Sequence, residues 1–378
     1  MKPSMLVRPA AIVTVALYSA ILPTGLAEEL QSPGNVVYAN DFGADIGDEW
    51  SKTDSSVTPI GERRFLGDFG PEKVTLSLMD LPEHQYVRVS FDLFLMQSWD
   101  GSSRRWGPDI WELSVADGKR LIYATFTNCG FFSDNNVQSF PDDHPVKTHK
   151  GWTGASEKQS LGYIWFHSRN DGKGYVTDGV YRINVIFPHT AASLKLNFTS
   201  HCKDAKDDQS WGLDNVNVET LTAATRLSIE DLNQCWVALS GDDPAAAFES
   251  IWRMVSSGEQ AVSFLDSQLR REASKQSDEI VSLVKELDDD NFQTRERATQ
   301  RLRRLGPGIE PALRKALQDA MSTESRFRIN TVLKDIDAKI NNPRETLRRK
   351  RAARVLEVID SKRARVLRKL IATTESDG

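Results

Sequence analysis

The sequence predicts two kinds of structure in one chain: an antiparallel β-sandwich followed by a short array of paired α-helices. Two observations lead to this prediction. Apolar and polar residues alternate between about residues 35 and 219, and apolar residues follow helical spacing after about residue 221. With 39% apolar and 8% aromatic residues, the chain of 378 residues has the composition of a globular protein.

The β-type pattern is clearest in residues 86–96, 181–187 and 194–198. In the first of these, Val87, Val89, Phe91, Leu93 and Leu95 occupy alternate positions, which places them on one face of a strand. Clusters of Gly, Asn, Asp and Pro at residues 100–103, 140–145 and 170–174 separate such runs. Many short strands with this punctuation predict an antiparallel sandwich or jelly roll.

The helical pattern recurs at residues 280–287, 298–305, 313–317, 332–336, 347–359 and 366–371. Gly306-Pro307 ends one predicted helix, and a turn is expected near Asp360-Ser361. Short amphipathic helices in antiparallel pairs cannot bury their apolar faces alone. We therefore expect them to stack as a solenoid or a small bundle.

One helical stretch carries a family resemblance. Residues 287–317, LDDDNFQTRERATQRLRRLGPGIEPALRKAL, combine an acidic turn, an Arg- and Ala-rich helix, a Gly-Pro break and a second helix containing Pro-Ala-Leu. Residues 347–371 resemble another such pair. The stretch is similar to the degenerate HEAT-like repeats of secreted bacterial proteins, particularly those of planctomycetes. The resemblance implies interaction surfaces rather than catalysis.

The β-type half carries a second resemblance. Its segments are NDFG at 40–43, VSFDLFLMQSWDG at 89–101, GPDIWELSV at 107–115 and SWGLDNVNV at 210–218. They resemble a bacterial concanavalin A-like or carbohydrate-binding-module-like jelly roll. An early Asp-Phe and a late Asp-Asn-Val that bracket a sandwich resemble families with a structural calcium ion.

The first 27 residues have the pattern of a signal peptide. Lys2 and Arg8 precede an apolar run at residues 10–22, and Gly25 and Ala27 fit a cleavage site. We therefore expect a secreted or periplasmic protein without a membrane span after cleavage. The predicted division is residues 1–27 as signal peptide, 28–219 as the jelly-roll domain, 220–278 as linker and lead-in helices, and 279–378 as HEAT-like repeats with a basic end.

Asp214 leads to a calcium hypothesis. It is in phase with Val216 and Val218, so we expect its side chain on their apolar face, while Trp211 and Leu213 are out of phase and predict a bulge or a strand start. An ionised carboxylate facing a core is costly unless it is paired or binds metal. The alternative is that Asp214 accepts hydrogen bonds from backbone amides in a turn. The candidate calcium ligands are Asp41, Asp92, Asp109 and Asp214.

Aromatic residues near the Gly- and Asp-rich connections suggest a carbohydrate site, because side chains that stack on sugars must be exposed near loops. The alternative is that these tryptophans fill the core of the sandwich. The candidate ligand-binding residues are Trp99, Asp100, Trp106, Trp111, Asn128 and Trp152.

Catalytic patterns are missing from the sequence. Jelly-roll glucanases that resemble this fold place their carboxylates along one strand as Glu-x-Asp-x-(x)-Glu, whereas the nearest match here is Asp109-Ile-Trp-Glu112. A spacing of three puts these two side chains on opposite faces of a strand. Of the three cysteines, Cys129 and Cys202 could pair, or all three could be free, and Cys235 has the pattern of a core thiol.

Charge is unevenly distributed along the chain. The net charge is -5, yet residues 344–369 hold eleven Lys or Arg against three Asp or Glu. This pattern is not that of a general nucleic-acid binder. The basic end is either a cationic face for an acidic partner or the solvated side of the last helices docked on the acidic remainder, and we favour the second. The residues concerned are Arg348, Arg349, Arg351, Arg363 and Arg365.

From these patterns we expect an exported, non-catalytic recognition protein. Its sandwich would bind a glycan or a cell-surface component, and its helical repeats would bind protein. The alternatives are a structural envelope protein without a specific ligand and an atypical glycoside hydrolase. The predicted cofactor is at most a structural calcium ion.

Overall fold

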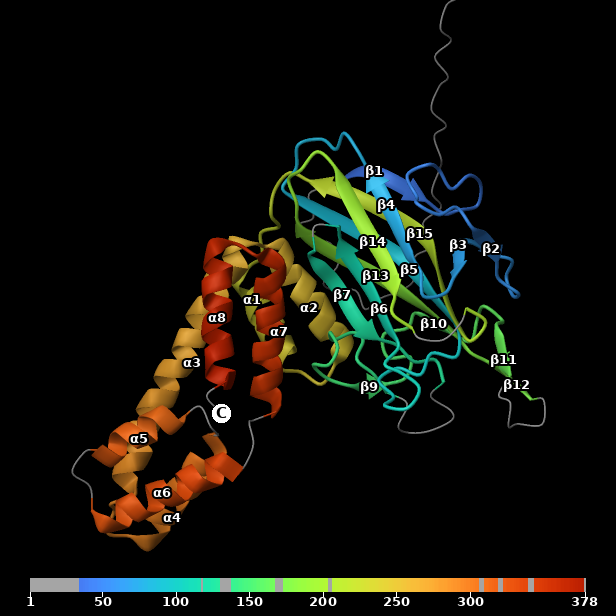
Figure 1. Ribbon diagram of the computed structural model, residues 1–378. Helices are drawn as coiled ribbons and strands as arrows, with labels where there is room; N and C mark the ends of the chain where they lie inside the picture. The colour runs from blue at the N-terminus through green and yellow to red at the C-terminus, as the bar shows by residue number, and fades with distance from the viewer. Residues whose placement is uncertain are drawn as a thin grey trace, which may run out of the picture. The chain divides into compact units, whose positions relative to one another are not determined.

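The computed structural model describes residues 34–116, 118–129, 137–166, 173–202, 206–305, 309–318, 322–338 and 343–376. The predicted signal peptide and the Gly306-Pro307 break lie outside these ranges. A β-rich region with antiparallel pairing is followed by a series of α-helices (Figure 1). The order of β structure before α structure, predicted from the change in apolar spacing, is confirmed.

The larger of the two main sheets is built around two long central strands, β5 and β15, which pair with each other. Its members, in spatial order, are β10 (Glu157–Lys158), β13 (Asp178–Pro188), β5 (Tyr86–Gln97), β15 (Gln209–Leu221), β3 (Arg64–Phe69) and β2 (Ser55–Val57), while β1 (Asn35–Asn40) also pairs with β15. The first strand, β1, therefore lies beside the last one, β15.

The smaller main sheet faces the same apolar core. Its strands are β4 (Lys73–Leu78), β14 (Leu194–Ser200), β6 (Ile110–Val115) and β7 (Arg120–Thr125). Phe91 of β5 packs against Trp111 of β6 and Phe198 of β14, with ring centroids 5.7 and 5.5 Å apart. The alternating residues predicted for β5, β13 and β14 are buried in this core, which confirms their inward face. Two short ribbons complete the β structure: β8 (Val137–Gln138) with β9 (His149–Lys150), and β11 (Ile164–Phe166) with β12 (Gly174–Val176).

The helices follow the predicted periods. They are α1 (Ile229–Leu239), α2 (Pro244–Ser256), α3 (Glu259–Glu286), α4 (Phe292–Leu305), α5 (Glu310–Gln318), α6 (Thr323–Ala338), α7 (Pro343–Ile359) and α8 (Lys362–Ser376). Ser228 caps α1 with a capping box, because its hydroxyl accepts from the Asp231 N–H while the Asp231 carboxylate accepts from the Ser228 N–H. As predicted, α4 ends at Leu305 and a turn at Asp360-Ser361 separates α7 from α8.

The helices divide between two apolar cores. Residues of α1, α2, α7, α8 and the first half of α3 belong to the core that also fills the space between the main sheets. The second core is made by the end of α3 with α4, α5 and α6. The last helical pair, α7 and α8, thus packs with α1, α2 and α3. A solenoid in which each pair stacks on the preceding one predicts a different set of neighbours.

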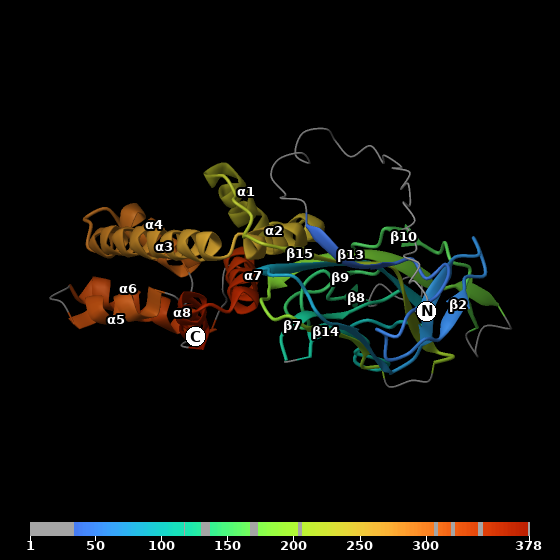
Figure 2. The ribbon, with the colours of Figure 1, turned by 90° about the horizontal axis from the view of Figure 1, so that it is seen from above.

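One helix joins the two cores. α3 has 28 residues, a length of about 42 Å at 1.5 Å per residue. Val262 and Leu265 near its start are buried in the first core, and Ile280 and Leu283 near its end are buried in the second. Figure 2 shows α3 as one uninterrupted helix that runs beside α4. None of the helices in the described ranges is long and apolar enough to cross a membrane.

Candidate functional site

A β-bulge decides where Asp214 points. The register of β15 against β5 shifts between Asp214 and Asn217, and Asn215 has a φ of 51°. The extra residue brings Trp211 and Leu213 onto the same inward face as the valines that follow, and all of them are buried in the core. The predicted bulge is present, but the expectation that Asp214 faces the apolar core is wrong. Its side chain lies on the outer face of the sheet.

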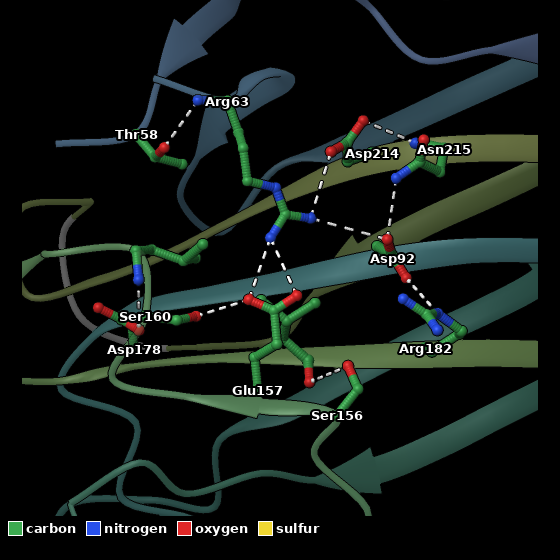
Figure 3. A network of polar contacts seen from close by, with 12 residues as sticks. Thr58, Arg63, Asp92, Ser156, Glu157, Ser160, Asp178, Arg182, Asp214 and Asn215 are labelled. Atoms are coloured by element: carbon green, nitrogen blue, oxygen red, sulfur yellow. Dashed lines mark hydrogen bonds and ion pairs between the residues drawn. The ribbon is translucent and has the colours of Figure 1, made fainter. Parts of the chain in front are cut away.

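On that outer face Asp214 lies opposite Asp92 of β5, and both are buried. The guanidinium of Arg63, just before β3, lies between them: its Nη2 is 3.4 Å from Asp214 Oδ2 and 3.7 Å from Asp92 Oδ2. The Nη1 of Arg63 donates to both carboxylate oxygens of Glu157, at 3.1 and 3.2 Å. Figure 3 shows this network, which we call the Arg63 cluster.

Further polar groups complete the Arg63 cluster. The Asn215 side-chain amide donates to Asp92 at 2.9 Å, and Arg182 of β13 donates to the other oxygen of Asp92 at 3.3 Å. Burial raises the pKa of Asp214 to about 6, against the lowering effects of the Asn215 N–H and of Arg63. Three carboxylates from distant parts of the chain are therefore held by two guanidinium groups, which neutralise most of their charge.

The four predicted calcium ligands do not come together as a set. The structure pairs Asp92 with Asp214, but Asp41 lies in the exposed turn after β1, where it accepts from the Gly43 N–H. Asp109 is buried before β6 and accepts from the Asp100 N–H. Within the described ranges, no group of three or more His, Cys, Asp or Glu side chains is arranged to hold a metal ion. Any ion between Asp92 and Asp214 would share the space with Arg63.

The predicted sugar-stacking tryptophans differ sharply in exposure. Trp99 and Trp111 are completely buried, so the expectation that their rings are open to a ligand is wrong. Trp99 is in phase with Leu95 and Leu93, and its indole N–H donates to the backbone oxygens of Met96 and Ser210.

Two other candidates have structural roles as well. Asn128 is buried and accepts from the Trp99 N–H at 3.0 Å while donating to the Thr177 carbonyl at 3.2 Å. Trp152 is half-buried, and its indole N–H donates to the Asp178 carbonyl at 3.1 Å. Trp106 differs from these, because 58% of it is exposed.

Internal hydrogen bonds order the loop that carries Trp106. The Ser103 hydroxyl accepts from the backbone N–H of Arg105 and of Trp106, and the Ser103 carbonyl accepts from Gly107. Ser102 donates to the Val137 carbonyl at 2.7 Å. The Arg105 guanidinium lies 4.6 Å from the centroid of the Trp106 ring. The loop therefore holds an exposed indole and a guanidinium together on a hydrogen-bonded turn.

The predicted cationic end is largely neutralised within the chain. Arg348 and Arg349 both pair with Glu345, Arg363 pairs with Glu259, and Arg365 pairs with Asp360. Three of these pairs are local, because Glu345 lies on α7 itself and Asp360 lies in the turn before α8; only the pair of Arg363 with Glu259 of α3 reaches the acidic remainder of the chain.

The expectation that Arg351 lies on a cationic face is wrong, because only 2% of this residue is exposed. Its Nε and Nη2 donate to the two oxygens of Asp142 at 2.7 and 2.8 Å, and its Nη1 donates to the Leu239 carbonyl. His149 also contacts Asp142, at 2.9 Å. Burial alone would raise the pKa of Asp142, but the bonds from Arg351 and His149 hold it below its usual value. The α7 helix is thereby fixed to the β-rich region.

The cysteines are not bridged. Cys129, Cys202 and Cys235 are all free and buried, so of the two alternatives for Cys129 and Cys202 the structure has the reduced one. Burial raises the pKa of the Cys129 thiol. The Ser98 hydroxyl lies 3.4 Å from its sulfur. The sulfurs behave as core groups rather than reactive ones.

Sequence reasoning missed Arg63, Glu157 and Asp142. Their partners are up to 209 residues away along the chain, so no short sequence motif indicates these ion pairs. It also missed an open groove of about 440 Å³ between α3 and α8. The groove is lined by Val262, Asp266, Arg270, Lys362, Arg363, Val366, Leu367 and Leu370.

Comparison with known proteins identifies no family. No family model matches the chain, and no curated protein does. Among solved structures, the chain is similar over 50% of its length to 14% of dimeric latent PorU from Porphyromonas gingivalis, with 12% identity and a TM-score of 0.27. Over 50% of its length it is also similar to 18% of a family GH115 4-O-methyl-α-glucuronidase, with 14% identity and a TM-score of 0.25.

A third similarity spans a whole adhesin domain. The similarity covers 49% of this chain and 99% of the K3 adhesin domain of Lys-gingipain from Porphyromonas gingivalis, with 11% identity and a TM-score of 0.24. The chain spans less than a fifth of the first two proteins.

Proposed function

We propose that this chain is an exported, non-catalytic recognition protein. Its β-rich region binds a glycan or another cell-surface component, and its helices bind protein. The β-rich region is a jelly roll of the concanavalin A-like or carbohydrate-binding-module-like kind, and the helices are HEAT-like units. The observation that carries the proposal is the hydrogen-bonded loop that exposes Trp106 beside Arg105.

The Trp106 loop has the properties of a binding anchor. An indole that is 58% exposed gains by burial against a ligand, and its loop is already ordered by internal hydrogen bonds, so binding costs little ordering entropy. The open side of the ring suits the apolar face of a sugar. Arg104 and Arg105 add two guanidinium groups that match carboxylate or sulfate substituents. An acidic glycan fits this chemistry best.

The test is a glycan array probed with the full chain, with calcium and with chelator. We expect binding to a defined class of acidic sugars, weakened at least about tenfold by Trp106→Ala. Met79→Ala, at another highly exposed apolar residue of the β-rich region, is the matched control and should bind normally. A flat array, or equal binding by Trp106→Ala and the wild type, would reject the glycan proposal.

The same assay tests calcium, which stays a prediction. Binding that disappears with chelator and returns with calcium would support a structural calcium ion near the sugar site. Calorimetric titration of calcium into the chelated protein without a heat signal would reject it. The predicted export is tested separately, by sequencing the N-terminus of the protein from the envelope or medium.

One observation favours the hydrolase alternative. Asp92, Asp214 and Glu157 converge on the outer face of the larger sheet, and burial raises the pKa of Asp214 to about 6, as burial does for the general acids of some hydrolases. The position between the carboxylates that a glycosidic bond would need holds the Arg63 guanidinium instead. We therefore assign the Arg63 cluster a structural role and prefer recognition to hydrolysis.

A further inference from the structure

The helix α8 has more apolar surface than its neighbours cover. Leu367 and Ile371, one turn apart, are buried against α3 and α7. Val366 and Leu370 form a second stripe with the same spacing, and they are 58% and 53% exposed. A helix on a globular core needs one apolar stripe, so the second stripe exceeds what the contact of α8 with the described part of the core requires.

This second stripe is one wall of the groove between α3 and α8. The buried side chains of Val262 and Leu367 line its floor, and the groove has a volume of about 440 Å³. Apolar walls at i and i+4 on α8, facing a second helix, make a trough that suits the apolar edge of a third helix. A helical partner would place residues at i, i+3 or i+4, and i+7 along it.

The rim of the groove carries an excess of positive charge. Asp266 pairs with Arg270 at 2.8 Å, and Glu259 pairs with Arg363 at 3.4 Å, so these charges cancel. Lys362 also lines the groove, and it forms no ion pair within the part of the chain that the structure describes. Lys369 adds a further cation on the same helix.

The positive charge at the rim of the groove favours an acidic partner over a second copy of this chain. A second copy of this chain would bring two α8 helices together, each with Lys362 at the groove and Lys369 on the same helix, and these like charges would oppose the contact. Arg363, Arg365 and Arg368 add little, because Glu259, Asp360 and Glu357 pair with them. An acidic partner gains from the same charges. We propose that the groove between α3 and α8 binds an amphipathic helix of a protein partner, with Asp or Glu residues flanking its apolar stripe.

This inference rests on the proposed protein-binding role of the helices and names the site and the partner's chemistry. The probe is a synthetic amphipathic peptide of about 18 residues with Leu at i, i+3, i+4 and i+7 and Glu on the flanks. A second peptide has Lys in place of Glu. Binding to the full chain is measured by fluorescence anisotropy at low and high salt.

We expect the Glu-flanked peptide to bind at least about tenfold more tightly than the Lys-flanked peptide, with the difference shrinking at high salt. Val366→Asp should abolish binding and Lys362→Glu should weaken it. Val281→Asp is the matched control for the first change, because Val281 is similarly exposed on α3 outside the groove. Lys334→Glu on α6 is the control for the second.

Equal binding of the two peptides, or an equal effect of Val366→Asp and Val281→Asp, would overturn the inference. So would light scattering that shows a dimer of the wild type and a monomer of Val366→Asp, because a second copy would then cover the groove. Trp106→Ala should bind the Glu-flanked peptide normally. Loss of glycan binding and loss of peptide binding are therefore separate outcomes, and failure of one leaves the other standing.

Discussion

The Arg63 cluster shows why a buried carboxylate is tolerated on the outer face of a sheet. Asp92 and Asp214 face each other on paired strands, where two negative charges would repel. Arg63 contacts both and also lies 4.5 Å from the centroid of the Phe94 ring. The compensation is incomplete, since burial still raises the pKa of Asp214 to about 6.

The raised pKa of Asp214 predicts how the stability of the fold changes with pH. Because the folded protein holds this proton more tightly than the unfolded chain, ionised Asp214 destabilises the fold above pH 6, and the penalty fades as the pH falls from 6 to 4. Asp214→Asn should therefore be more stable than the wild type at pH 7, by about 1 kcal/mol after the loss of the Arg63 contact. Urea denaturation at several pH values measures this.

The control for that experiment is Asp41→Asn, an exposed carboxylate whose replacement should change little. The difference in unfolding free energy between Asp214→Asn and the wild type should disappear near pH 4. A variant that is less stable at pH 7 and has the wild-type pH dependence would show that the carboxylate is fully compensated.

For individual tryptophans, their place in alternating runs of the sequence predicts burial better than their proximity to loops does. Trp111 is in phase with Leu113 and Val115, and Trp99 is in phase with Leu95, so alternation alone places both rings in the core. Trp106 belongs to no alternating run. For these three indoles, period-two phase distinguishes buried from exposed rings, whereas proximity to Gly and Asp does not.

Among the elements, α7 is held by several polar contacts, of which the ion pair between Arg351 and Asp142 is the most deeply buried. Arg351 and Asp142 are both buried, and Arg354 on the next turn adds an ion pair to Asp143 at 2.7 Å. Lys119 also donates to the Val358 carbonyl near the end of α7. The helix is thus bound to the loops of the β-rich region through its polar side as well as its apolar one.

Arg351→Met should destabilise the protein by about 3–5 kcal/mol, because it leaves the Asp142 carboxylate buried without its guanidinium. The double variant Arg351→Met with Asp142→Ala should cost less than the sum of the two single changes. Arg349→Met, whose ion pair is only half-buried, should cost at most about 1 kcal/mol and serves as control. Thermal and urea denaturation give these values, and equal costs for Arg351→Met and Arg349→Met would contradict the proposed anchoring role.

The ends of α4 and α7 were predictable from the sequence, but the extent of α3 and the neighbours of each helix were not. Gly306-Pro307 and Asp360-Ser361 mark ends through local backbone chemistry. The packing of α7 on α2 depends on long-range contacts, and a basic amphipathic pattern fits a stacked repeat and a docked helix equally well.

For the whole molecule, the unfolding of the two apolar cores can be followed by two different spectroscopic signals. All nine tryptophans precede residue 253, and none lies in the core of α4, α5 and α6. Leu302→Ala in that second core should lower its stability by about 2–5 kcal/mol. Far-ultraviolet circular dichroism should then show an earlier loss of helix, while the tryptophan fluorescence transition stays in place.

Leu196→Ala, between the main sheets, is the matched control and should shift the fluorescence transition instead. If Leu302→Ala moved both signals together, the long helix α3 would couple the two cores into one cooperative unit.

The ion pair of Arg351 with Asp142 also has a consequence for synthesis. The two residues are 209 positions apart, so at 5–20 residues per second the ribosome adds the guanidinium roughly 10–40 s after the carboxylate. Throughout that interval the nascent β-rich region exposes the apolar surface that α7 later covers. A chain that ends before residue 351 should therefore leave this surface and the Asp142 carboxylate uncovered, and limited proteolysis should cleave it faster than the full chain.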